Sequence, residues 1–125
     1  VGSEMCIRDS ISRTDVLLFG IGTAMRMADQ RHIADDVRKQ LVDNHAVGEA
    51  LGQYCDIEGK LIYSTNNIGL SLPDVVKVPN VIAVAGGQEK ASAIIGVMRA
   101  CQKGILIIDE QAAEGMRQLL QISAL

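Results

Sequence analysis

The sequence predicts an α/β protein with a parallel sheet whose strands are joined by right-handed crossover connections. Three continuous apolar runs, Val16–Phe19, Val81–Ala85 and Ile105–Ile108, are typical of buried strands. Each run leads into residues with helical spacing, and an alternation of strands and helices is characteristic of parallel sheets. With 125 residues, the chain has room for one domain of this kind and not for two.

Two helices are expected after the first strand, which closes on Gly20-Ile21-Gly22. Thr23 is placed to cap the first of them, and residues at helical spacing follow it: Ala24, Met27, Ala28 and Arg31. Apolar residues at every fourth position predict the second helix, which ends near Asn44: Ile33, Val37 and Leu41.

The middle of the chain has a weaker pattern. Residues 45–56 fit either a helix or a strand, whereas Leu61–Tyr63 indicates a strand and Asn66-Asn67 a turn. The second and third apolar runs each lead into a helix. The first of these helices buries one face: Ala91, Ile94, Ile95, Met98 and Cys101. The last one is capped by Asp109 and buries five residues: Ala112, Ala113, Met116, Leu119 and Leu120.

Composition argues against two classes of partner for this chain itself. The net charge is −3, from 12 Lys and Arg against 15 Asp and Glu. The sequence also lacks the basic stripe with interleaved aromatic residues that is typical of proteins that bind nucleic acids. No apolar run approaches the roughly 18 residues of a membrane span, and the start does not resemble a signal peptide. We therefore expect a cytoplasmic protein without a membrane partner.

The first ten residues do not fit the rest of the chain. Residues 1–10 show neither a helical nor a strand period, and they precede a clear strand. We interpret them as the translation of a sequencing-library adapter, to be excluded from the fold and expected not to pack on the core. A genuine frayed N-terminus is the alternative. Under either interpretation the native protein is expected to begin upstream, so that 11–125 is the C-terminal part of a longer protein.

No metal or cofactor is expected. Cys55 and Cys101 are far apart, without a CxxC motif or a histidine at metal-ligand spacing. The turn Gly20-Ile21-Gly22 lacks the third glycine of a dinucleotide fingerprint, because Met25 stands there. A GxxxxGK[ST] phosphate loop is absent as well.

Three predicted strand ends are candidate ligand sites, because ligands of open parallel sheets bind beyond the carboxyl ends of the strands. They are the turn of Gly20 and Gly22, the turn of Gly86 and Gly87, and Asp109. The second is the most informative, because two glycines admit a ligand to the backbone and Lys90 follows in the next helix. Its residues outline a phosphate site. The alternative is a plain turn beside a solvated lysine.

Two charged residues are weaker candidates. Glu49 is a single acid among small apolar residues, where its carboxylate would accept hydrogen bonds from sugar hydroxyls. A solvated helix position is the more common explanation of such a residue. The side chain of Arg31 would contact either an anion or only solvent, and the sequence pattern alone favours solvent.

Three stretches together resemble a known family. They are Asp15–Gly22, His45–Gly52, and Val81–Gly87 with Lys90–Ile94. In order and spacing they are similar to the effector-binding domain of SorC-type sugar-responsive transcriptional regulators, over about Thr14 to Leu120. The resemblance implies a Rossmann-like parallel sheet of the sugar-phosphate isomerase type, used as a sensor.

The resemblance also implies partners and site residues. A phosphorylated sugar would bind this domain and modulate operator binding by an N-terminal helix-turn-helix that lies outside the chain, in a homo-oligomer. By position, Lys90 with Gly86 and Gly87 would hold a phosphate, and Glu49 would bind sugar hydroxyls. Arg31 would hold a second phosphate if the ligand is a bisphosphate. The turn of Gly20 and Gly22 is assigned to the same effector site.

Two other functions remain open at this level. A sugar-phosphate isomerase or deaminase has the same fold, and Glu49 is the acid best placed in the sequence to serve as its base. We expect no catalysis, because few candidate bases lie near the strand ends. A domain used only for oligomerisation would leave the Gly86-Gly87 turn and Lys90 unexplained.

Overall fold

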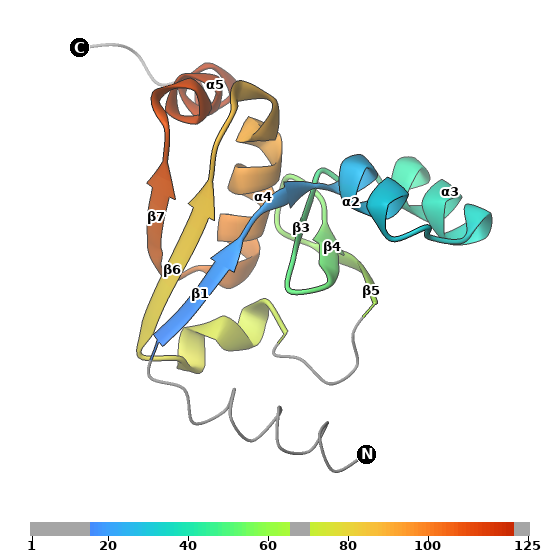
Figure 1. Cartoon of the computed structure of the whole chain (residues 1–125), viewed down its shortest axis with the longest axis horizontal. Coiled ribbons are helices and arrows are strands. Elements are labelled where there is room, and N and C mark those ends of the chain that lie inside the picture. The colour runs from blue at the N-terminus through green and yellow to red at the C-terminus, as the bar shows by residue number, and fades with distance from the viewer. Residues whose placement is uncertain (1–15, 66–70, 122–125) are drawn as a thin grey trace.

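The computed structural model describes residues 16–65 and 71–121. Its main sheet has three parallel strands in the order β1 (Val16–Gly20), β6 (Asn80–Ala85) and β7 (Ile105–Ile108) (Figure 1). Leu18 pairs with Ile82, which pairs in turn with Ile105. The α/β class and the parallel sheet predicted from the three apolar runs are therefore confirmed. The burial predicted for these strands is wrong at Leu18 and Ile105, which are 66% and 64% exposed. Residues 1–10 and the turn predicted at Asn66-Asn67 lie outside the described residues.

Helix α4 (Ala91–Cys101) covers one face of this sheet and forms the centre of the core (Figure 1). Ile94 and Val97 are fully buried there, together with Ala83 from β6, and Phe19 from β1 is 7% exposed. The burial predicted for α4 is confirmed at Ala91, Ile94, Ile95 and Cys101, whereas Met98 is half-buried. Buried residues extend almost all round the helix because the chain between β1 and β6 packs on its other side.

Helix α5 (Glu110–Leu120) follows β7 at the carboxyl end of the sheet. Asp109 caps it as predicted, since its carboxylate accepts the N–H of Ala112 at 2.8 Å. The predicted burial is wrong for most of the helix: only Ala112 and Gly115 are buried, Met116 is half-buried, and three of the predicted residues are exposed: Ala113, Leu119 and Leu120. The helix packs a narrow stripe against α4 and the 3-10 turn η2 (Gln88–Lys90) instead of lying over the sheet.

A second, antiparallel sheet was not predicted. Its four strands follow one another as β2 (Gly22–Thr23), β3 (Gly48–Ala50), β4 (Gln53–Cys55) and β5 (Leu61–Ser64). The ambiguous segment 45–56 is thus a hairpin, whose turn places Leu51 and Gly52 in the left-handed region, at φ 54° and 80°. Strands of two to four residues are too short to show a period of two, which is why the pattern was undecided.

Helices α2 (Ala24–Gln30) and α3 (Asp35–Asp43) extend to one side of the body (Figure 1). Both were predicted, but Arg31 and Ile33 lie between them, and Thr23 makes no side-chain capping bond. Their apolar face packs on the second sheet in a small cluster of its own: Ala24, Ala28, Leu41 and Tyr54. The 3-10 helix η1 (Pro73–Lys77) leads back to β6.

The junction between α4 and the hairpin gives a stability prediction at Gly96. A Cβ at this glycine would lie 2.4 Å from the backbone oxygen of Asp56 and 3.0 Å from Val47 Cγ2. Gly96→Ala is therefore expected to destabilise the fold by about 2 kcal/mol in chemical denaturation, although alanine is the better helix former. The control is Gly20→Ala, whose Cβ meets no atom closer than 3.8 Å. A Gly96→Ala protein as stable as wild type would show that helix and hairpin are not in contact.

Candidate functional site

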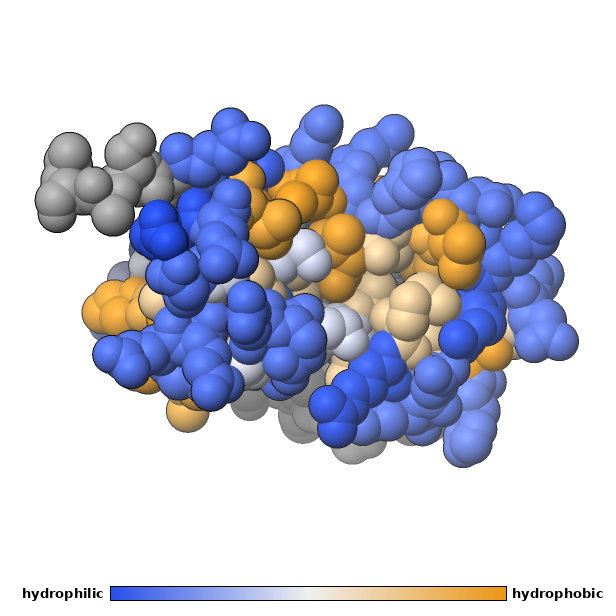
Figure 2. Space-filling model, turned by 90° about the horizontal axis from the view of Figure 1, so that it is seen from above, coloured by the Kyte–Doolittle hydropathy of each residue, from blue (hydrophilic) through white to orange (hydrophobic). Residues whose placement is uncertain are grey.

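An open cleft of about 860 Å³ lies at the carboxyl ends of β1 and β6, between the parallel sheet and the α2 side of the molecule. Seen from above, apolar and weakly polar atoms occupy the middle of this face and hydrophilic side chains surround them (Figure 2). The lining comes from both sheets, α2 and η2: Phe19, Gly20, Ile21, Gly22, Thr23, Arg26, Met27, Gln30, Arg31, Glu49, Leu51, Gly52, Thr65, Val84 and Lys90.

Five of the seven predicted site residues line this one cleft, although they come from distant parts of the sequence. They are Gly20, Gly22, Arg31, Glu49 and Lys90. The crossover between β1 and β6 folds back over the end of the sheet and brings α2 and β3 beside the β1 end. The location matches the rule that ligand sites of parallel sheets lie beyond their carboxyl ends.

Gly86 and Gly87 are not among the residues that line the cleft. Gly87 has a φ of 100°, which favours glycine, and its N–H donates to both carboxylate oxygens of Asp109, at 3.2 and 3.1 Å. Hydrogen bonds from Ala112 and Gly87 lower the pKa of Asp109. The donor that was assigned to a phosphate therefore holds the turn against the start of α5 in this structure.

Glu49 lies on β3 with only 4% of its surface exposed, so the interpretation as a solvated helix position is wrong. Its Oε1 is 3.0 Å from Nη2 of Arg31 and accepts the N–H of Gly52 at 3.1 Å. The structure shows no partner for Oε2 among the described residues. A buried carboxylate that is paired at one oxygen keeps the other available to a ligand hydroxyl.

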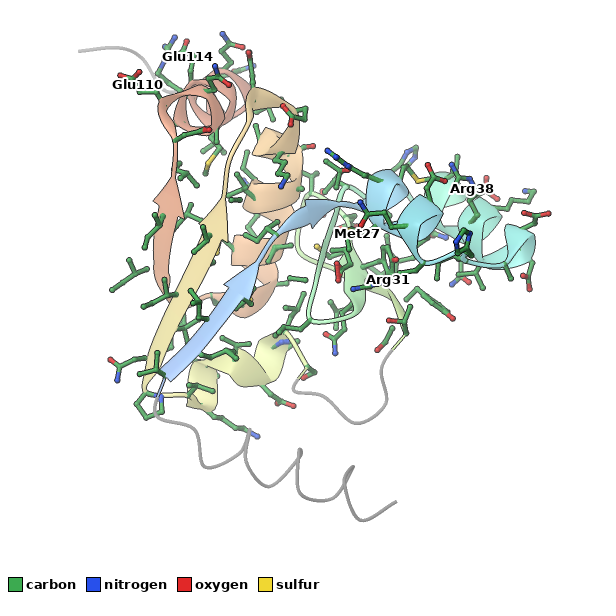
Figure 3. All side chains as sticks on the ribbon, in the orientation of Figure 1. Met27, Arg31, Arg38, Glu110 and Glu114 are labelled. Atoms are coloured by element: carbon green, nitrogen blue, oxygen red, sulfur yellow. The ribbon has the colours of Figure 1, made fainter. Side chains whose placement is uncertain are left out.

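Arg31 follows the last residue of α2, and its side chain extends toward the hairpin of β3 and β4 (Figure 3). The side chain is 35% exposed, so the guanidinium reaches both Glu49 and the open cleft. Partial burial disfavours its charge, but Glu49 and Tyr54 outweigh that effect and raise the pKa of Arg31. The sequence pattern favoured solvent for this side chain, whereas the structure pairs it with a buried acid.

Tyr54 was missed by the sequence analysis. It stands opposite Glu49 in the β3–β4 ladder, is fully buried, and its hydroxyl has no hydrogen-bond partner among the described residues. Burial raises the pKa of this hydroxyl, and the neighbouring Arg31 guanidinium offsets only part of the effect. Tyr54 thus lies next to both members of the ion pair, although it does not line the cleft.

Tyr54→Phe is expected to change the free energy of unfolding by less than about 1 kcal/mol, because the hydroxyl that is lost has no hydrogen-bond partner within residues 16–65 and 71–121. Urea denaturation of both proteins measures the difference. The matched control is Tyr63→Phe, since Tyr63 pairs with Tyr54 across β4 and β5. A loss of about 2 kcal/mol or more for Tyr54→Phe alone would show that the hydroxyl binds Arg31 in solution.

Lys90 closes η2 and is the N-cap residue of α4. It is half-buried and makes no ion pair with any residue in the described part of the chain. Together with Arg26 and Arg31 it gives the described lining three cations against one acid, Glu49, an excess of two positive charges. Such a cleft attracts an anionic ligand.

Four other polar lining residues were not predicted: Thr23, Arg26, Gln30 and Thr65. Arg26 and Gln30 are four residues apart on α2, so they lie on the same face of the helix. Since the helix itself was predicted, their position close to Arg31 could have been predicted from the sequence as well. No pattern in the sequence around Thr65 indicated that it lines the cleft.

Neither a metal site nor a membrane span is found in residues 16–65 and 71–121. These residues contain no group of three or more His, Cys, Asp or Glu side chains that could hold a metal ion. Cys55 and Cys101 are buried free thiols, and the burial of Cys101 was predicted from the helical spacing. No helix in the same ranges is long and apolar enough to cross a membrane.

Comparison with known proteins defines the class. Residues 5–118 match the family described as "Putative sugar-binding domain". The chain therefore belongs to this family of sugar-binding domains. The match begins within residues 1–10, whose origin from an adapter stays a prediction.

Individual relatives agree with this assignment. The chain is 35% identical over 108 residues to the central glycolytic genes regulator of Bacillus subtilis, and the match covers 86% of this chain and 32% of the regulator. It superposes with a TM-score of 0.82 and 37% identity on the "putative SorC family transcriptional regulator" from Enterococcus faecalis, covering 90% of this chain and 46% of that one. On the full-length sorbitol operon regulator SorC from Klebsiella pneumoniae the chain superposes with a TM-score of 0.73 and 26% sequence identity. The match covers 90% of this chain and 37% of that one. The chain thus spans about a third of the curated regulator and less than half of either solved chain.

Proposed function

We propose that the cleft binds a phosphorylated sugar and that the chain is the ligand-sensing part of a sugar-responsive transcriptional regulator. The observation that carries the proposal is the combination of one buried carboxylate with an excess of cations on a single cleft. The carboxylate suits a polyhydroxy compound and the cations suit an anionic group, and a sugar phosphate has both. Membership of the sugar-binding domain family supports a polyhydroxy compound as the ligand.

The proposal gives each residue a role. Glu49 accepts sugar hydroxyls through Oε2, while its Oε1 stays with Arg31 and Gly52. Lys90 holds the phosphate at the start of α4, where the helix dipole favours an anion. Arg31 holds a second phosphate when the ligand carries one.

The partners of the whole protein are part of the proposal. Operator DNA would be bound by a helix-turn-helix outside this chain, in a cytoplasmic homo-oligomer whose DNA binding responds to the sugar. The names of the relatives support this, since they are transcriptional regulators. The net charge of −3 does not favour DNA binding by this chain, which agrees with DNA binding by another part of the protein.

Sensing is favoured over the isomerase or deaminase alternative. Among the residues described, the cleft lining offers no histidine and only one acid, and that acid is held in an ion pair by Arg31. A proton transfer at a sugar carbon needs a base and a matching acid in position. The regulators with which the chain aligns support the same choice.

The complete protein is expected to convert no ribose, glucosamine or fructose phosphate. A coupled spectrophotometric assay with each substrate checks this, with a commercial isomerase as positive control. Turnover that disappears in Glu49→Gln would favour the enzyme instead.

Calorimetric titration of the full-length protein tests the proposal directly. The panel contains sugar monophosphates, sugar bisphosphates and the same sugars without phosphate. We expect at least one phosphorylated member to bind about ten-fold or more tightly than its unphosphorylated counterpart. Equal affinities within every pair would rule out a phosphate subsite, and binding of none would leave the cleft without a sugar-phosphate ligand.

A further inference from the structure

The glycine turn before Lys90 is covered by a carboxylate of the protein itself. Glu89 belongs to the turn that connects β6 to α4 and lies beside α5 (Figure 1). A Cβ built on Gly87 would lie 2.5 Å from Oε1 and 2.8 Å from Oε2 of Glu89, so this side chain folds back against the backbone of the turn. The Gly87 N–H donates to Asp109 at the same time. Two acidic side chains thus occupy the turn whose glycines were predicted to hold an anion.

The carboxylate of Glu89 is held there by no specific bond. The side chain is exposed, and it makes no hydrogen bond or ion pair with the part of the chain that the structure describes. Its position is favoured by α4, because the positive end of a helix dipole attracts a negative charge near the first turn. The same dipole favours the phosphate that Lys90 would hold. A carboxylate and a phosphate therefore compete for one end of this helix.

The cleft lining agrees with a covered turn. Lys90 belongs to the lining, whereas Gly86 and Gly87, three and four residues before it, do not. Glycine leaves the backbone accessible because it has no side chain of its own, and at Gly87 the Glu89 carboxylate takes up that space. The predicted phosphate subsite is thus open at its lysine and covered at Gly87.

We propose that Glu89 sets the affinity of the phosphate subsite: its carboxylate is a resident anion that moves away from Gly87 before a phosphate can lie between the turn and Lys90. The inference rests on the proposed function, since it requires a phosphate at Lys90. Displacing Glu89 and placing a second anion near it weakens the binding of every phosphate.

This competition keeps small free anions out of the cleft. A sugar phosphate compensates for the repulsion by its hydroxyl contacts to Glu49, which lines the same cleft. Inorganic phosphate has only the subsite at Lys90 and no hydroxyl contacts to add. Glu89 therefore leaves inorganic phosphate unbound at concentrations at which the sugar phosphate still binds.

Inorganic phosphate is the probe for the test, added to the full-length protein and followed by ³¹P NMR titration. Glu89→Gln is expected to bind it about three- to ten-fold more tightly than wild type, and the phosphorylated sugars to gain by a similar factor in calorimetry. The ratio between the two proteins should fall towards one at about ten-fold higher salt, because salt screens exposed charges. Glu89→Ala repeats the measurement without an amide that takes the place of the carboxylate.

The control Glu58→Gln removes an exposed acid of the β4–β5 turn, outside the cleft lining, and is expected to bind inorganic phosphate like wild type. A merely structural role of Glu89 predicts slightly lower stability in urea and no gain in affinity. If wild type binds sugar phosphates and Glu89→Gln binds phosphate no more tightly, or if Glu58→Gln gains as much, this inference is overturned and the proposed function stands. If wild type binds neither sugar phosphates nor inorganic phosphate, both are overturned.

Discussion

Lys90→Ala is expected to weaken binding of a phosphorylated sugar by about one to two orders of magnitude. A charge-assisted contact to phosphate is worth roughly 1.5–3 kcal/mol, and every 1.4 kcal/mol or so corresponds to a factor of ten in affinity. The lysine is free for this contact, because it makes no ion pair with the described residues. Calorimetric titration of the full-length wild type and variant measures the loss.

Two controls separate a phosphate contact from a general change of charge. Lys77→Ala removes an exposed lysine outside the cleft, and it is expected to bind the sugar phosphate like wild type. Lys90→Ala itself should unfold at nearly the same denaturant concentration as wild type, since no described contact depends on its ammonium group. If Lys90→Ala binds normally while Glu49→Ala does not, the phosphate lies elsewhere in the cleft. If neither change matters, the cleft is not the sensor site.

Arg31→Ala is expected to lower the free energy of unfolding by about 2–3 kcal/mol. The substitution leaves the carboxylate of Glu49 buried with one hydrogen bond, from Gly52, and without its counter-charge. Removing one partner of a fully buried pair costs about 3–5 kcal/mol, and the partial exposure of Arg31 to the cleft reduces this figure. Urea denaturation at neutral pH measures the loss.

A double-mutant cycle shows whether the loss comes from the ion pair. In Glu49→Gln the charge that needs Arg31 is gone, so Arg31→Ala is expected to cost much less in that background. Arg38→Ala serves as the control, because the one ion pair that Arg38 makes with the described residues is to the exposed Asp29 on the α2–α3 side. Equal losses in both backgrounds would show that Arg31 stabilises the protein by packing and not by neutralising Glu49.

The strands of the parallel sheet could be predicted because their signal is local. Val81–Ala85 and its two partners are continuous apolar runs, and each is followed by a helix with its own apolar spacing. The cap at Asp109 was predictable for the same reason, since a capping carboxylate bonds to an N–H only three residues away. The sequence by itself therefore determined the α/β class, the order of the long elements and the strand ends at which Gly20 and Lys90 lie.

Only the tertiary structure decided the character of the site. Glu49 is a buried ion-pair partner because a hairpin of three-residue strands packs against α4, and such short strands leave no period in the sequence. Gly86 and Gly87 carry the pattern of an anion-binding turn, yet the Gly87 N–H binds Asp109, 22 residues further along. Leu18 and Ile105 are apolar enough to predict burial, but burial depends on whether another layer lies over them. Local patterns specify an element and its apolar residues, whereas the partner of each side chain depends on contacts between segments that are distant in sequence.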